Sequence, residues 1–204
     1  YTIKELQEMD SYAKSKNIEL TPCIQTLAHL SGIFRYANYG NIKDIDDILL
    51  VGNDKTYEFI DHLFLSLSKA FSSRKIHIGM DEAFMLGRGK YLDNNGLEEK
   101  SMIMKKHLDK VLKIASKYGF ECEIWGDMYL HAAYDNNQDN SSIVKENIPT
   151  NLKLCCWDYY HVDINDYVEM IKKYKKLSNN ISFAGGAWTW LGFCPNNSYS
   201  LKIT

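Results

Sequence analysis

The sequence lacks an excess of charge of either sign. Its 204 residues hold 24 Lys and Arg against 26 Asp and Glu, which gives a formal net charge of only -2. Proteins that bind nucleic acid normally carry a positive field to attract the phosphate backbone. The composition therefore argues against a nucleic-acid partner.

Long apolar runs are also missing. No run approaches the about 20 residues that a membrane-spanning helix needs, and the N-terminal YTIKELQEMD is neither a basic leader nor an apolar signal core. We expect no membrane partner. Because the sequence begins at Tyr1 rather than Met, part of the parent protein is expected upstream.

The cysteine pattern lacks any C-x-x-C pair. The five cysteines are an odd number and lie mostly inside apolar runs, which predicts buried reduced thiols rather than a disulfide frame or a zinc site; they are Cys23, Cys122, Cys155, Cys156 and Cys194. No Gly-x-Gly-x-x-Gly or Walker pattern follows any expected strand. We therefore expect no metal and no cofactor, and a cytoplasmic compartment, with export of the full-length parent left open.

What the sequence does contain is an alternation of helical and strand patterns. A capping box at Thr2 and Glu5 opens a helix, and apolar stripes predict further helices around residues 60–71, 98–118 and 163–178. Five short apolar runs predict strands at residues 18–24, 75–79, 121–125, 152–157 and 181–185. Residues 25–54 and 80–96 are expected to be loops.

This alternation predicts an α/β fold with a parallel sheet, because right-handed crossovers need a helix between neighbouring strands. Long loops follow the strands and tight turns precede them, as in a (β/α)8 TIM barrel. We expect residues 1–204 to be a single catalytic-barrel segment of about five strand–helix units; an open doubly wound sheet is the alternative. Expressed alone, such a segment would expose sheet edges, so we expect little turnover and poor solubility.

The segment HIGMDEA, residues 77–83, carries the sharpest chemical signal. Side chains alternate faces along a strand, so Gly79 leaves space in front of two carboxylates, Asp81 and Glu82. Beyond the strand end the backbone can turn enough for both to face one pocket. Such a pair suits glycosidic chemistry, in which one carboxyl is protonated and the other ionised. The alternative is a solvated pair in a surface loop.

Aromatic residues gather at the ends of the later strands. Rings at the mouths of loops suit the apolar faces of a sugar, and we favour that role over capping of the barrel. The residues concerned are Trp125, Trp157, Tyr159, Tyr160, Trp188 and Trp190, with Tyr129 and Tyr91 in the same loops.

Five segments, taken together and in this order, resemble the family 20 glycoside hydrolases, the β-N-acetylhexosaminidases. The resemblance spans almost the whole chain, which would correspond to strands three to seven of the family barrel. The His-x-Gly-x-Asp-Glu signature is the motif that is specific to the family. The segments are IELTPCIQTLAHL at 18–30, HIGMDEA at 77–83, IWGDM at 124–128, WDYY at 157–160 and GGAW at 185–188.

The resemblance implies a retaining enzyme that removes terminal β-linked GlcNAc or GalNAc from a glycan or oligosaccharide. Glu82 matches the residue that protonates the leaving oxygen and later activates water. Asp81 matches the residue that holds the 2-acetamido N–H of the substrate. The acetamido oxygen, rather than an enzyme group, attacks the anomeric carbon and forms an oxazolinium ion.

The resemblance also implies binding residues. Trp125, Trp157 and Trp188 would wall the acetamido pocket, and a tyrosine after Trp157, Tyr160 in preference to Tyr159, would bind the acetamido oxygen.

His29 matches a family histidine near the acid/base residue, although a structural histidine is equally compatible with the sequence. Asp127 and Asp158 are candidates for sugar hydroxyls or for structural hydrogen bonds. Trp190 stands where many relatives carry a glutamate, and the arginine and aspartate of the first two family strands, like the eighth strand, have no counterpart.

Two other functions fit the same residues. One is a metal-dependent barrel lyase or hydrolase that uses His77, Asp81 and Glu82 as ligands. The other is a barrel that binds N-acetyl sugars without cleaving them.

Overall fold

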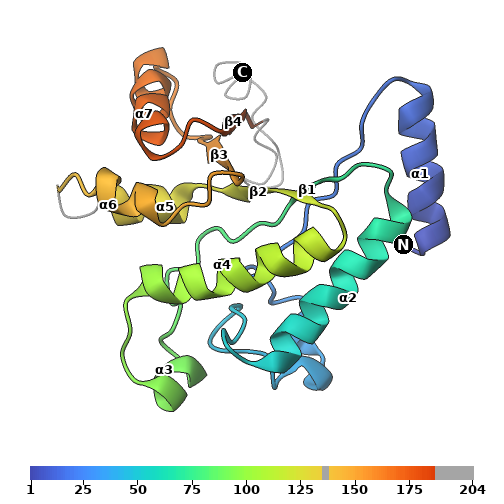
Figure 1. Ribbon diagram of the computed structural model, residues 1–204, viewed down its shortest axis with the longest axis horizontal. Helices are drawn as coiled ribbons and strands as arrows, with labels where there is room; N and C mark the ends of the chain where they lie inside the picture. The colour runs from blue at the N-terminus through green and yellow to red at the C-terminus, as the bar shows by residue number, and fades with distance from the viewer. Residues whose placement is uncertain (135–137, 187–204) are drawn as a thin grey trace, which may run out of the picture. The chain divides into compact units, whose positions relative to one another are not determined.

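A computed structural model of the chain describes residues 1–134 and 138–186 (Figure 1). The chain divides into two compact units, Tyr1–Glu123 and Ile124–Thr204, which are described in turn. The expectation of one barrel segment over residues 1–204 stays a prediction.

The first unit is mainly helical. The sequence predicts its three long helices, whereas the short helix α3 and two single 3-10 turns fall inside expected loops. The elements are α1 (Ile3–Ser15), η1 (Ile33–Arg35), η2 (Ala37–Tyr39), α2 (Asp54–Ala70), α3 (Lys90–Asn95) and α4 (Lys100–Lys117).

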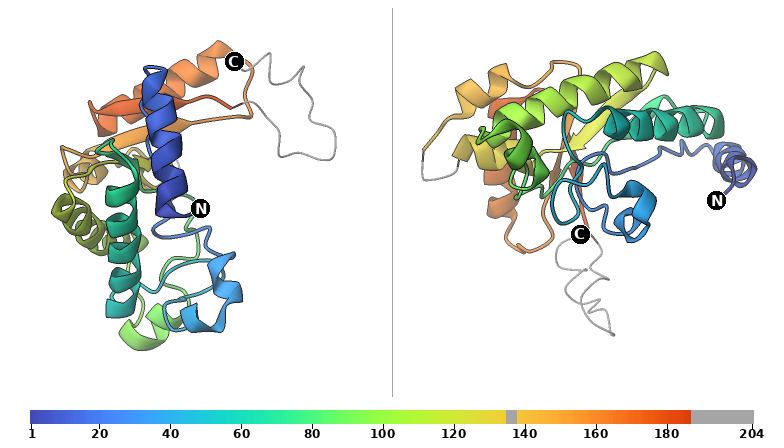
Figure 2. Two further views of the ribbon diagram at one scale, coloured as in Figure 1. Left: turned by 90° about the vertical axis from the view of Figure 1, so that its right-hand side faces the viewer. Right: turned by 90° about the horizontal axis from the view of Figure 1, so that it is seen from below.

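Helix α1 begins at the predicted capping box. The Glu5 N–H donates to Thr2 Oγ1 at 3.2 Å, and the Thr2 N–H donates to Glu5 Oε2 at 2.6 Å. The helix lies against α2 (Figure 2). The buried Asp10 accepts a hydrogen bond from the N–H of Ser72 at 3.1 Å. Helix α1 is thus fastened at the point where the chain leaves α2 for the first strand.

Strand β1 (Lys75–His77) pairs in parallel with the first residues of β2 (Glu121–Trp125). The strand expected over residues 18–24 is reduced to a single bridge between Cys23 and His77. Pro22 has no N–H to donate, and on the other side the ladder stops at Gly79, where φ is +72°. The Gly79 N–H turns back to His77 Nδ1 at 3.1 Å, so β1 ends two residues earlier than the sequence predicts.

The second unit continues the alternation of helix and parallel strand. Its elements are α5 (Asp127–Tyr134), α6 (Ser141–Glu146), β3 (Lys153–Trp157), α7 (Ile164–Leu177) and β4 (Ile181–Ala184). Gly126, next after β2, donates its N–H to the Cys155 carbonyl in β3, and β3 pairs in parallel with β4. The strand order is therefore β1-β2-β3-β4, the order of the chain.

The predicted apolar stripes of α2 and α4 form part of the core of the first unit. Ile60 and Phe64 from α2 and Leu108 and Val111 from α4 are all 0% exposed, and α2 packs on α4. Among the described helices, none combines the length and apolarity needed to cross a membrane.

Most of the described cysteines are buried thiols, as predicted. Burial raises the pKa of Cys122 and of Cys156 to about 12 each. Cys23 differs, because it lies exposed beside the isolated bridge, where the expected strand does not form. Cys194 lies outside the described residues.

A buried histidine joins the helices of the first unit to the segment beside the bridge. His107 in α4 is 0% exposed, and its Nε2 lies 2.8 Å from the carbonyl oxygen of Thr26. A carbonyl only accepts, so Nε2 carries the hydrogen and Nδ1 accepts from the Tyr57 hydroxyl at 3.2 Å. The Tyr57 oxygen in turn accepts from the N–H of Gly52. Burial lowers the pKa of His107 to about 4.

Acid should destabilise the fold through His107. Its folded pKa lies below the ordinary value of 6.5, so the unfolded chain binds the proton first as the pH falls. We expect a loss of about 3 kcal/mol in unfolding free energy between neutral pH and pH 4 from this residue. Urea unfolding at a series of pH values measures it. His107→Gln should flatten the pH dependence below pH 6.5 and His62→Gln, at an exposed position of α2, should not; equal slopes in all three proteins would contradict the assignment.

Candidate functional site

Asp81 and Glu82 meet at His29 in the first unit. His29 Nε2 lies 3.2 Å from Asp81 Oδ2 and 3.3 Å from Glu82 Oε2. The Asp81 side chain is 16% exposed and that of Glu82 is 40% exposed, so both can be reached from solvent. A proton on Nε2 of His29 would stabilise either carboxylate in its ionised form.

The backbone after β1 makes this meeting possible. Consecutive side chains in a regular strand point to opposite faces, but Gly79, Met80 and Glu82 have φ values of +72°, +73° and +51°. His29 also has a positive φ of +59°. These left-handed conformations cost of order 1–3 kcal/mol each at residues other than glycine and concentrate at functional sites. The backbone thus makes the turn that both acids need in order to face the same pocket.

Two further residues touch this group, and the sequence analysis missed both. Gln25 donates from Nε2 to Asp81 Oδ1 at 2.8 Å. Asp47 Oδ2 lies 3.7 Å from His29 Nδ1, on the ring edge opposite the two acids. Asp47 lies inside a segment read only as a long loop, but Gln25 stands where the expected strand ends, and that position was a usable signal.

His77 lies in β1 and is not part of the group that His29 forms with Asp81 and Glu82. It is buried, and its Nδ1 accepts the Gly79 N–H. Burial lowers its pKa, which the nearby Glu123 and Asp81 partly oppose. In the described part of the chain, the ligand atoms close enough to share a cation belong to His29, Asp81 and Glu82, within 4.8 Å of one another. The ligand set expected around His77 is replaced by one around His29.

In the second unit, Trp157 ends β3 and lies against two other candidate residues. Its ring stacks on Tyr159 with centroids 5.4 Å apart and planes at 30°. Its indole Nε1 donates to Oδ1 of the buried Asp127 at 3.4 Å. Gly186 approaches Tyr159 so closely that a Cβ there would collide with the ring. Trp125 ends β2 in the same unit and is partly buried.

Asp158 serves the turn that follows β3. Its Oδ1 accepts from the N–H of Tyr160 at 2.7 Å and of His161 at 3.2 Å, and its Oδ2 lies 2.6 Å from His161 Nδ1. The contact raises the pKa of His161. These bonds favour the structural alternative for Asp158. Tyr160 is 56% exposed. Trp188 and Trp190 lie outside the described residues.

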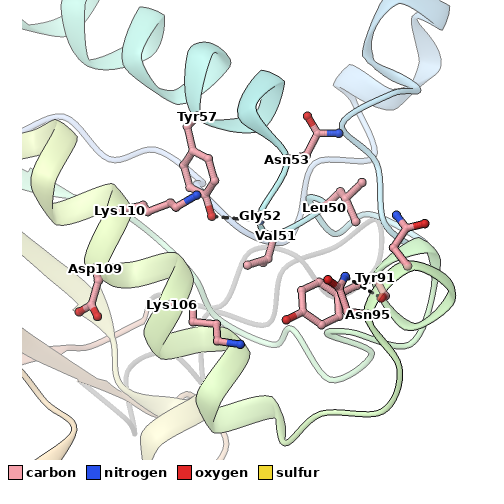
Figure 3. A pocket seen from close by; sticks show the side chains of 11 residues that line it. Leu50, Val51, Gly52, Asn53, Tyr57, Tyr91, Asn95, Lys106, Asp109 and Lys110 are labelled. Atoms are coloured by element: carbon pink, nitrogen blue, oxygen red, sulfur yellow. Dashed lines mark hydrogen bonds between the residues drawn. The ribbon is translucent and has the colours of Figure 1, made fainter.

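A separate cavity of about 620 Å³ lies between α2, α3 and α4 of the first unit (Figure 3). Lys110 Nζ lies 4.3 Å from the centre of the Tyr57 ring, whose hydroxyl is bonded to Gly52. Tyr91 and Lys106 line the other side, and both bond to Glu98. Of the aromatic residues named from the sequence, Tyr91 lines this cavity.

Comparison with curated proteins finds hexosaminidases. Human hexosaminidase D is 20% identical over 188 residues, which cover 86% of this chain and 37% of that protein. Hexosaminidase D of Bos taurus is 19% identical over 201 residues, covering 93% of this chain and 54% of that protein. The chain thus spans between about a third and about half of the length of these relatives.

Solved structures share the fold. The Vibrio harveyi GH20 exo β-N-acetylglucosaminidase in complex with N-acetylglucosamine matches with a TM-score of 0.65 at 14% identity, covering 92% of this chain and 29% of that one. The β-N-acetylhexosaminidase of Bacteroides fragilis gives 0.65 at 16%, covering 100% and 40%. A mutant Streptomyces plicatus β-hexosaminidase in complex with GlcNAc gives 0.58 at 18%, covering 92% and 34%.

These matches agree with the strands and helices described above, which form part of a TIM-barrel fold. The model of the glycosyl hydrolase family 20 catalytic domain matches residues 1–161, which include Asp81, Glu82 and His29. Because that model matches most of its length, the chain belongs to glycosyl hydrolase family 20.

Proposed function

We propose that the protein carrying this chain is an exo-β-N-acetylhexosaminidase that releases terminal β-linked GlcNAc or GalNAc with retention. The observation that carries the proposal is the convergence of Asp81 and Glu82 on His29, inside the part of the chain that matches the family. The names of the similar proteins point to the same substrates. Because the chain covers only part of those proteins, the activity of the whole protein rests on this proposal.

In the proposed reaction the sugar supplies the nucleophile. Asp81 accepts a hydrogen bond from the acetamido N–H, and the acetamido oxygen attacks the anomeric carbon. The bond from that carbon to the leaving oxygen breaks, and the leaving oxygen takes the proton of Glu82. The carboxylate of Asp81 stabilises the positive charge of the resulting oxazolinium ion.

The second half of the reaction restores the enzyme. The Glu82 carboxylate takes a proton from water, whose oxygen attacks the anomeric carbon on the face that the leaving group left. The bond between this carbon and the acetamido oxygen breaks, and the sugar departs with its original configuration. His29 contacts both acids, so it supports whichever of them is ionised at each stage.

The aromatic residues of the second unit are the proposed sugar-binding group. The stacked pair of Trp157 and Tyr159 offers flat apolar surface to a pyranose ring. Trp125, Tyr160, Trp188 and Trp190 stay candidates for the same role, and a cytoplasmic location stays a proposal.

Glu82→Gln should abolish most turnover in the full-length protein and leave binding intact. The amide cannot donate a proton to the leaving group, so we expect kcat on a chromogenic β-GlcNAc substrate to fall by about 10²–10⁴-fold. Product binding, measured by calorimetry, should change little. Glu58→Gln, at an exposed position of α2, is the matched control. Unchanged turnover in Glu82→Gln would remove the acid/base assignment, and a wild-type protein that binds GlcNAc without cleaving the substrate would be a sugar-binding barrel.

A thiazoline analogue of the cyclised intermediate should inhibit the wild-type protein competitively. Asp81→Ala should weaken this inhibition by about 10–100-fold, the loss expected for one hydrogen bond to a charged group. The inhibition constants of the two proteins measure the effect. Inhibition of equal strength in both would show that Asp81 does not hold the acetamido group.

A metal-dependent hydrolase is the second candidate, because His29, Asp81 and Glu82 can surround a cation. Substrate-assisted hydrolysis needs no metal, so we expect prolonged dialysis against EDTA to leave the initial rate unchanged. A loss of rate that added Zn²⁺ or Mn²⁺ restores would favour the metal enzyme instead.

A further inference from the structure

Gln25 touches both the carboxylate of Asp81 and the strained turn that presents it. Its Nε2 donates to Asp81 Oδ1 at 2.8 Å, and its Oε1 accepts the N–H of Met80 at 3.2 Å. The Met80 N–H can only donate, so it fixes which end of the amide faces Asp81. The Gln25 side chain therefore connects the Asp81 carboxylate to the backbone of the residue before it.

The surroundings leave the Gln25 side chain little freedom. A Cβ on Gly79 would collide with the Gln25 amide, so the absence of a side chain at Gly79 makes room for the clamp. On either side of Gln25, the Ile24 N–H donates to the His77 carbonyl and the Thr26 N–H donates to the Ile78 carbonyl. These backbone bonds fix Gln25 beside residues 77 and 78, directly before the turn that its side chain contacts.

The two carboxylate oxygens of Asp81 contact different partners. Oδ1 receives the Gln25 amide, and Oδ2 lies 3.2 Å from His29 Nε2. Rotation of the carboxylate would break the first contact, so the direction of its remaining lone pairs is set by Gln25. An amide hydrogen bond to a carboxylate is of the charge-assisted kind, and it is stronger than one between neutral groups.

We propose that Gln25 is a positioning residue, which holds Asp81 in the orientation that accepts the acetamido N–H of the substrate. This inference rests on the proposed hexosaminidase function. It assigns to Gln25 no contact with the sugar, only an action through Asp81. Its effect must therefore depend on the presence of the Asp81 carboxylate.

A double-mutant cycle in the full-length protein tests this dependence. Gln25→Met keeps the length of the side chain and removes both hydrogen bonds. We expect kcat on a β-GlcNAc substrate to fall by about 10–100-fold, with a much smaller change in KM. In an Asp81→Ala background, assayed at high enzyme concentration, the same change should alter kcat less than about 2-fold because the coupled partner is gone.

Two further variants separate positioning from a structural role. Gln25→Glu keeps the acceptor for the Met80 N–H and loses the donor to Asp81, so it should lose at least as much activity as Gln25→Met. Gln7→Met is the matched control, since Gln7 lies exposed on α1 and donates to the Lys69 carbonyl of α2, and its kinetics should equal those of the wild type. Circular dichroism and thermal unfolding show whether each variant is folded.

The outcomes are distinct. Equal losses from Gln25→Met with and without Asp81 would overturn the inference, as would wild-type activity in folded Gln25→Glu. If Gln25→Met does not fold, Gln25→Glu alone decides, and activity in it again overturns the inference. A wild-type protein that leaves every β-N-acetylhexosaminide intact would refute the proposed function itself.

Discussion

The turn after β1 is the constraint on which the rest of the site depends. A continued strand would send Asp81 and Glu82 to opposite faces, and positive φ angles at Gly79, Met80 and Glu82 bring them to the same histidine. The two residues other than glycine pay a conformational cost. Burial offsets it, because Ile78 and Met80 on either side of Gly79 are 0% exposed.

Polar side chains, rather than further pairing of strands, support the turn after β1. The Thr26 hydroxyl donates to the Ile78 carbonyl just before Gly79, and beyond Gly79 the Gln25 amide bonds to the Met80 N–H and to Asp81. Thr26 is held in turn by the neutral His107. Thr26 and His107 are both 0% exposed, so movement of either would leave a polar group unsatisfied in the core. The geometry of the acids is thus connected to the packing of α2 and α4.

The sequence predicts those features that local chemistry determines. The capping box at Thr2 and Glu5 and the apolar stripes of α2 and α4 repeat at helical spacing, so they are visible in a short window. Helices α3 and α5 are too short to show such a stripe, and α3 falls in an expected loop. The strand over residues 18–24 has a strand-like composition, but Pro22 and the turn at Gly79 leave it one bridge.

The residues of the candidate site also differ in how far the sequence predicts them. Asp81 and Glu82 belong to one short motif, and His29 follows from the family resemblance. Gln25 stands where an expected strand ends, but its partner Asp81 lies far along the chain, and Asp47 lies inside an expected loop, where no pattern marks it. The structural bonding of Asp158 was likewise one of two alternatives that only the position of His161 could separate.

Cys23 lies near the carboxylates of Asp81 and Glu123, and its thiol is partly desolvated. Partial desolvation and the charges of Asp81 and Glu123 raise the pKa of its thiol. Alkylating agents and peroxides attack the thiolate rather than the thiol. Partial burial first, and the two neighbouring carboxylates second, therefore keep the proton on this sulfur at neutral pH and lower the share of the reactive thiolate.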